Sequence, residues 1–231
     1  MFGFLSFGMI VVIALTVILN IIIARSKSRE FNYDAVVEAE RRANAARRRD
    51  IDPELFITPD IDALPFKEYG QKPEYEPVRF AAAEAKEMSA LPMIKTAKDM
   101  TNNDIKLKFG VANLEDVAIM EENYNYFIAA MLKWAEELIA LREYADAETV
   151  LKETVRIGSD FSKSYTLLAD VYAAVNDRTA LCALYDAASA DNFFPDDVQL
   201  KNKVVQYAAD LLDTADGEMY NDGGAPGGDA Q

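Results

Sequence analysis

The stretch that decides the fold is YTLLADVYAAVNDRTALCALYDAAS, residues Tyr165–Ser189. On both sides of Asn176-Asp177, apolar residues recur every three to four positions, which is the spacing of a helix that buries one face. Asn and Asp favour turns, so the stretch predicts two amphipathic helices joined by a tight turn. Such a pair is either part of an irregular helical domain or one unit of a repeat.

A matching pattern lies 34 residues earlier in the chain. Within the first helix of each pair, Met131 aligns with Tyr165, Trp134 with Leu168, Ala135 with Ala169 and Leu138 with Tyr172. In the second helices, the residues that fall on Leu181, Tyr185 and Ala188 are Ala147, Leu151 and Thr154. The period and the order of large and small residues resemble the tetratricopeptide repeat, whose signature is W-x2-L-G-x2-Y followed by A-x3-F. The resemblance covers about residues 130–195; it lacks the signature glycine, and Leu181 stands where a small residue is usual.

The resemblance implies a tetratricopeptide-like α-helical (α-solenoid) domain over residues 78–213. Together with an N-terminal single transmembrane helix (residues 1–25), which the apolar run described below predicts, the expected fold class is all-α. Only two units are recognisable and a free-standing array needs about three, so we expect the flanking helices to cap both ends. The alternative is a non-repeat helical domain with coincidental spacing. The expected helices are one that starts at Asn113 with a capping signal to Asp116, and then Tyr144–Ile157, Phe161–Val175, Arg178–Ala190 and Asp196–Asp213.

In this family, the first helix of each unit lines a concave groove that takes a peptide or a helix. The resemblance places these residues in the groove: Leu132, Glu136, Ile139, Lys163, Thr166, Asp170 and Ala173. Glu136 and Asp170 stand where some members carry the asparagine of a carboxylate clamp. The resemblance therefore implies a protein partner with a basic or amphipathic segment. For each residue alone, a solvated helix face is the alternative.

The charge of the chain is unevenly distributed. Residues up to Arg49 include 8 basic and 4 acidic residues, which leaves 16 basic and 35 acidic residues, a net charge of −19, for the rest. A body this acidic repels a phosphate backbone and argues against nucleic-acid binding. The chain has no histidine and one cysteine, Cys182, which excludes Ser-His and Cys-His pairs, histidine-containing zinc sites and an intrachain disulfide. We predict no catalytic residue, no metal and no cofactor.

Residues Phe2–Ala24 carry no charge over 23 positions. As a helix they would be about 34 Å long, enough to cross a bilayer, and a cleaved signal peptide would need a basic start and a small-residue cleavage site. Basic residues follow directly, so the positive-inside rule predicts a single-pass protein of the cell membrane, with the N-terminus outside and the domain in the cytoplasm. The residues predicted to contact lipid headgroups, or only to fix topology and solubility, are Arg25, Lys27, Arg29, Arg41, Arg42, Arg47, Arg48 and Arg49.

Three further segments differ in composition. Residues 26–49 form a basic segment with the composition of a juxtamembrane helix. Residues 50–77 contain five prolines interspersed with apolar residues, which predicts an extended strip along the domain or along a partner. Residues 214–231 are acidic and glycine-rich, which predicts a disordered tail.

From these features we expect a non-catalytic, membrane-anchored adaptor or scaffold that presents its groove to a protein partner. One alternative is an obligate subunit of a larger membrane complex, with the Pro-rich strip threaded between partners. The other is a membrane-tethered enzyme that uses carboxylates or tyrosine, for which the sequence offers no motif.

Overall fold

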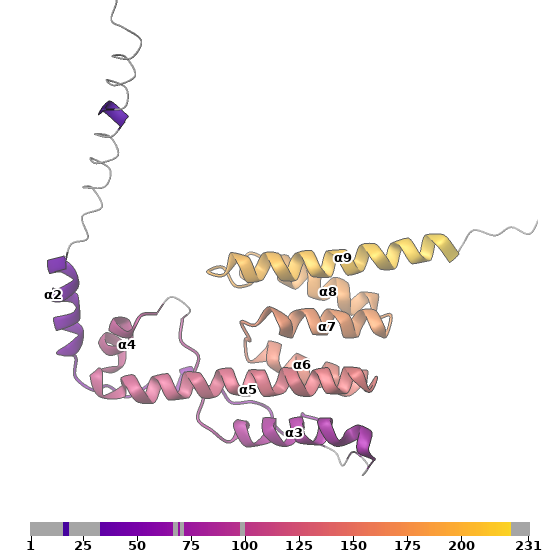
Figure 1. Cartoon of the computed structure of the whole chain (residues 1–231), viewed down its shortest axis with the longest axis horizontal. Coiled ribbons are helices and arrows are strands. Elements are labelled where there is room, and N and C mark those ends of the chain that lie inside the picture. Colours follow the sequence, from indigo (N-terminus) through magenta and orange to yellow (C-terminus); the bar gives the residue numbers. More distant parts are fainter. Residues whose placement is uncertain (1–15, 19–32, 67–68, 70–71, 98–99, 223–231) are drawn as a thin grey trace, which may run out of the picture.

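The computed structural model describes residues 16–18, 33–66, 69, 72–97 and 100–222, with side chains in the last helix up to Thr214. Its described helices are α2 Tyr33–Asn44, α3 Glu76–Ser89, α4 Asn102–Phe109, α5 Leu114–Ala140, α6 Tyr144–Arg156, α7 Ser162–Ala174, α8 Arg178–Ser189 and α9 Val198–Asp222, with short 3₁₀ turns at Pro53–Leu55, Pro73–Tyr75 and Val111–Asn113. Helices α3, α5, α7 and α9 lie side by side as a front layer, and α6 and α8 lie behind them (Figure 1). The expected all-helical character is confirmed for the described residues.

The residues aligned at a spacing of 34 form the interior of this stack. All of them are buried except Tyr185, which is half-buried. Trp134 in α5 and Leu168 in α7 occupy corresponding positions in the main core, and Ala135 and Ala169 beside them are small enough for neighbouring helices to approach closely. The aromatic and small positions quoted from the sequence therefore pack helix against helix.

The turns between helices repeat as well. After α5, Glu143 N–H donates to the Leu138 carbonyl at 2.9 Å and Arg142 N–H donates to the Ile139 carbonyl at 2.9 Å. After α7, 34 residues later, Asp177 N–H donates to the Tyr172 carbonyl at 2.8 Å and Asn176 N–H to the Ala173 carbonyl at 3.0 Å. Both are Schellman motifs, and both place one residue in the left-handed region, with φ of 61° at Arg142 and 57° at Asn176. The α5–α6 and α7–α8 hairpins are thus closed by the same backbone geometry.

The Pro-rich strip packs on its own domain. Ile57 N–H donates to the Met93 carbonyl at 2.9 Å, and the Phe66 ring stacks on buried Trp134 with centroids 4.8 Å apart. Farther along, the Tyr69 hydroxyl donates to Asp146 at 2.9 Å, near the start of α6. The strip runs antiparallel to α6, because its earlier residues meet the end of that helix. Of the two predicted locations, the domain surface is correct for the described part of the strip.

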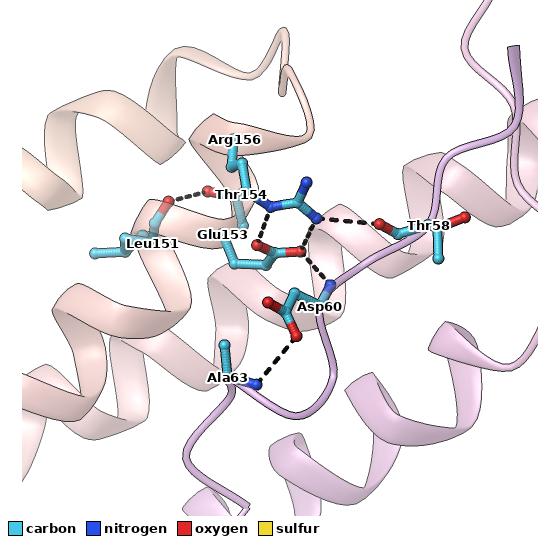
Figure 2. Close-up of polar contacts among 7 residues, drawn as sticks. All are labelled: Thr58, Asp60, Ala63, Leu151, Glu153, Thr154 and Arg156. Atoms are coloured by element: carbon cyan, nitrogen blue, oxygen red, sulfur yellow. Dashed lines mark hydrogen bonds and ion pairs between the residues drawn. The ribbon is translucent and has the colours of Figure 1, made fainter. Parts of the chain in front are cut away.

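One buried carboxylate fastens the strip to α6 (Figure 2). Glu153 is 6% exposed, and its Oε1 accepts the Asp60 backbone N–H at 2.7 Å. Arg156 donates to both oxygens of the same carboxylate, at 2.6 and 2.7 Å, and also to the Thr58 carbonyl at 3.0 Å. These three N–H donors replace the water hydrogen bonds that the Glu153 carboxylate loses on burial. The strip is therefore held by polar bonds as well as by apolar side chains.

A smaller cluster joins α2 and α4 to the start of α5. Gly110, with φ of 89°, lies so close to the Arg47 carbonyl that an added Cβ would be 2.4 Å from its oxygen. The Asn113 side chain donates to the carbonyls of Arg49 and Phe109, at 2.6 and 3.0 Å, and makes no cap bond to α5. Asn113 thus occupies the predicted N-cap position of α5, but its side chain does not cap the helix, because its amide bridges two carbonyls of the preceding segments.

The membrane part of the predicted fold class requires correction. The predicted span, residues 2–24, lies outside the described residues except for positions 16–18. In the part of the chain that the structure describes, no helix has the length and apolarity needed to cross a bilayer. The physical reason is that these helices are amphipathic: even the longest, α5, carries charged residues along its exposed side. The fold class becomes all-α without a transmembrane helix among the described residues, and the predicted single-pass localisation in the cell membrane is withdrawn with it.

Two boundaries also differ from expectation. Helix α2 ends at Asn44, so residues 45–49 of the basic segment are not helical, and residues 26–32 lie outside the described part. Helix α9 continues to Asp222, past the expected end at Asp213. The rest of the predicted tail, residues 223–231, lies outside the described residues.

We predict that Glu153→Ala lowers the free energy of unfolding by about 1–3 kcal/mol, because it leaves the Asp60 N–H and the inner face of the Arg156 guanidinium without an acceptor. The matched control is Glu148→Ala on the same helix, which breaks an ion pair with a Lys152 side chain that is 58% exposed, and should change stability by less than about 1 kcal/mol. Urea unfolding of both variants measures the difference. Equal effects would contradict the role given to Glu153.

The α6–α7 turn is a third Schellman motif, in which Ser159 N–H donates to the Thr154 carbonyl at 2.9 Å and Gly158 N–H donates to the Val155 carbonyl at 3.0 Å. We predict that substitutions at the left-handed position of these three turns have different effects on stability. Arg142→Gly should stabilise the domain by up to about 1 kcal/mol because it relieves a left-handed arginine, whereas Asn176→Gly should change little because asparagine tolerates this region. Gly158→Ala should destabilise by about 1 kcal/mol through its φ of 78° alone, since the added Cβ would meet no atom closer than 3.9 Å. Thermal unfolding ranks the stabilities of the three variants. If Arg142→Gly lowers the melting temperature, the strain assigned to the left-handed Arg142 is contradicted.

Candidate functional site

Helices α5 and α7 bring the predicted groove residues onto the front layer, with α9 as the next helix along that layer (Figure 1). Leu132 is buried and Ile139 is half-buried against the main core, so both form the floor of this face. Thr166 is half-buried and Ala173 is exposed on α7. The main core therefore lies directly beneath this face, and the charged side chains on it are Glu136, Lys163 and Asp170.

The first two of these charged residues meet. Lys163 Nζ of α7 lies 2.6 Å from Glu136 Oε1 of α5, and the two side chains remain 50% and 44% exposed. One helix farther along the front layer, Lys133 of α5 pairs with Glu84 of α3 at 3.2 Å and also lies over the Phe80 ring. Exposed pairs of this kind contribute roughly 0–1 kcal/mol each, so a competing charge can replace either partner at little cost.

Asp170 repeats the position of Glu136 in the next front helix. It lies 34 residues after Glu136, and its Oδ1 accepts a hydrogen bond from the Tyr207 hydroxyl of α9 at 2.7 Å. Partial burial raises the pKa of Asp170, and the bond from Tyr207 opposes that rise. The same bond, followed by burial, raises the pKa of Tyr207 to about 12. The front face thus carries two acidic residues one repeat period apart, each bonded to the following helix.

Sequence reasoning missed Tyr207 because it treated the last helix as a cap. The buried residues of α9 include Leu200 and Val204, which follow Tyr165 and Ala169 by 35 residues instead of 34. A one-residue insertion before α9 explains the shift, so a spacing of 35 residues aligns these positions of α9 with those of α7. A second concavity, where three loops meet at one end of the stack, was also missed, because its residues come from distant segments.

Other predicted or conceivable sites find little support among the described residues. The described residues contain no cluster of three or more His, Cys, Asp or Glu side chains that could hold a metal ion. Cys182 is a half-buried free thiol on α8. Arg41, Arg42 and residues 47–49 are exposed, and the Arg49 backbone is bonded to Phe109 and Asn113; Arg25, Lys27 and Arg29 lie outside the described part. The headgroup role of these residues stays a prediction.

We predict that Asp170→Asn makes the domain more stable near neutral pH. A carboxyl whose folded pKa is raised contributes stability below that pKa and loses it as the pH rises through it, whereas asparagine stays neutral and its amide oxygen still accepts from Tyr207. The advantage of the variant should shrink as the pH falls below about 4. Urea unfolding at several pH values tests this, with Asp186→Asn on the exposed side of α8 as the control. A variant that is less stable than wild type at neutral pH would contradict the prediction.

No protein-family model, no curated protein and no solved structure matches this chain.

Proposed function

We propose that the helical domain is a non-catalytic adaptor or scaffold of the tetratricopeptide-like type, which binds a basic or amphipathic segment of a protein partner on its α5–α7–α9 face. The observation that carries this proposal is the spacing of Glu136 and Asp170. They occupy corresponding positions of two parallel neighbouring helices, on the same face, in a body whose net charge after Arg49 is −19. Both acids lie at the surface of helices whose other sides pack into the main core.

The supporting geometry is the pairing of each acid with a replaceable donor. Lys163 holds Glu136 through an exposed ion pair, and Tyr207 holds Asp170 through one hydroxyl. A lysine or arginine of a partner can take either place, since exposed pairs contribute little and a charged donor is stronger than a hydroxyl. Neighbouring helices are about 8–10 Å apart, so we propose a segment with two basic side chains separated by roughly that distance.

The obligate-subunit alternative loses its main argument, because it needed the Pro-rich strip to lie between partners. The described part of the strip instead packs against α5 and α6 of its own domain through Phe66, Tyr69 and the Glu153 carboxylate. The carboxylate-enzyme alternative gains no support either: Glu136 and Asp170 belong to separate helices and face separate donors.

Selection from a displayed peptide library tests the proposed function. The full-length wild-type protein should enrich peptides that carry paired basic residues, and their affinity should fall with added salt. The double variant Glu136→Gln/Asp170→Asn should bind these peptides about tenfold more weakly, because it removes both acceptors, while Lys163→Ala should bind them more tightly because it frees Glu136.

The matched control is Glu148→Gln/Asp186→Asn, which removes the same two charges from α6 and α8 of the rear layer. This control should bind as well as wild type, so that loss of binding is assigned to the front face and not to net charge. Enrichment of acidic or purely apolar peptides, or equal weakening by both double variants, would reject the proposal.

A further inference from the structure

Helix α2 is attached to the domain near its C-terminal end. The Asn44 side chain accepts a hydrogen bond from Lys106 Nζ of α4 at 2.8 Å, and just beyond the helix Arg49 N–H donates to the Phe109 carbonyl at 2.9 Å. In the described part of the chain, α4 is the helix against which α2 packs, and α2 stands apart from the stack (Figure 1). The last turn of α2 is therefore held in place, while its first turns project from the domain.

The rest of α2 is uncovered. Every residue from Tyr33 to Arg42 is exposed, and Ala43 is the one buried residue of this helix. A helix of 12 residues is marginal in water when no tertiary packing supports it. The ion pair between Glu38 and Arg41, at 3.7 Å with both side chains more than half exposed, contributes little. We therefore expect a further surface to cover α2.

Apolar side chains form a stripe along the exposed part of α2. Tyr33, Val36 and Val37 are 69%, 42% and 37% exposed. Val36 and Val37 follow Tyr33 by three and four positions, so the three side chains share one side of the helix. Beside the stripe lies a shallow hollow of about 430 Å³. It is lined by Val37, Glu40, Arg41, Asn44 and Ala45.

The charge along α2 changes sign from one end to the other. The acidic residues Asp34, Glu38 and Glu40 precede the basic residues Arg41 and Arg42. Asp34 and Arg41 are seven residues apart, so they lie two turns apart on the same flank of the apolar stripe. When two such helices pair antiparallel, Asp34 of each copy lies opposite Arg41 of the other. A parallel pair would place like charges opposite each other, which is destabilising.

We propose that α2 pairs with α2 of a second copy of this chain, antiparallel and about a two-fold axis near Val37. The Val36 and Val37 side chains of the two copies meet at this axis. Tyr33 of each copy lies against residues 40–42 of the other, beside the hollow. Two helices of about 18 Å bury a small area, so the dimer belongs to the weak class that buries less than about 1,200 Å².

A second copy fits α2 better than a uniformly charged partner does. An acidic surface would attract the last turn of α2 and repel its first turns, and a basic surface would do the reverse. A second copy in the antiparallel orientation matches both halves at once and covers the stripe with an identical stripe. This self-complementarity is the property of an interface between two copies that are related by a two-fold axis.

Sedimentation equilibrium of the full-length protein over a concentration series tests the pairing. The wild type should associate reversibly, and Asp34→Arg or Arg41→Asp should each weaken the association about tenfold, because each variant opposes like charges twice. The matched control is Arg42→Asp, which changes an exposed neighbour on the side of α2 away from the stripe and should leave the association unchanged.

The double variant Asp34→Arg/Arg41→Asp gives the decisive comparison. It restores opposite charges across the antiparallel pair, so its association should return to within about threefold of the wild type. If these residues only stabilised α2 through the helix dipole, the double variant would be weaker than either single variant. That result, or two single variants that associate like the wild type, would overturn the proposal.

Disulfide crosslinking locates the contact directly. In a Cys182→Ser background, which removes the native thiol, Val37→Cys should form an intermolecular disulfide under mild oxidation, because the two Cβ atoms at the axis come within about 4 Å of each other. Ala39→Cys, an exposed residue on another side of α2, is the control and should remain uncrosslinked. Equal crosslinking at the two positions, or none at Val37, would contradict the pairing.

This inference goes beyond the proposed function and does not rest on it. The double variant Glu136→Gln/Asp170→Asn should lose peptide binding and keep the self-association, whereas Asp34→Arg should keep peptide binding. If the front-face variant abolishes the self-association, the basic end of α2 docks on the acidic front face of a second copy, and the antiparallel pairing is wrong.

Discussion

Helix α6 has to be covered on the side that faces away from α7, and the rest of the structure depends on how this is done. Its other sides contact α5 and α7, so an uncovered flank would leave the apolar residues of the main core in water. A helix could cover it, as in a longer stack, but the chain uses an extended strip instead. Extended backbone cannot satisfy its own N–H groups, and this is why a buried carboxylate, Glu153, lies where the Asp60 N–H needs an acceptor.

Most of the local structure was predictable because it is encoded over a few residues. The amphipathic period fixed α6, α7 and α8 to within two residues, and the turn residues at Asn176 and Gly158 marked two of the Schellman motifs. The path of the strip was not predictable in the same way, since its apolar residues suit a partner as well as its own domain. The deciding contact joins Asp60 and Glu153, which are 93 positions apart, and nothing in either local sequence indicates the other.

The two errors have different physical origins: one polar group with a competing use, and one change of spacing. Asn113 has the residue type and position of an N-cap, but its amide is used by the carbonyls of Arg49 and Phe109, which local reasoning could not see. On the candidate face, the resemblance to the tetratricopeptide repeat placed Glu136 and Asp170, yet a one-residue change in spacing before α9 hid the bond from Tyr207. Periodicity finds equivalent positions only as long as the spacing is constant.

Two kinds of polar contact in this domain differ in how they respond to the loss of a partner. The Glu153 carboxylate is 6% exposed and has three donors, so losing one partner leaves a buried group unsatisfied. The Glu136–Lys163 pair is about half exposed, so water can replace either partner. The proposed binding face would have to exchange its polar partners without unfolding the domain. The buried Glu153 carboxylate and the exposed pairs on the front layer would together meet that requirement, because the carboxylate holds the strip in place while the exposed pairs face solvent.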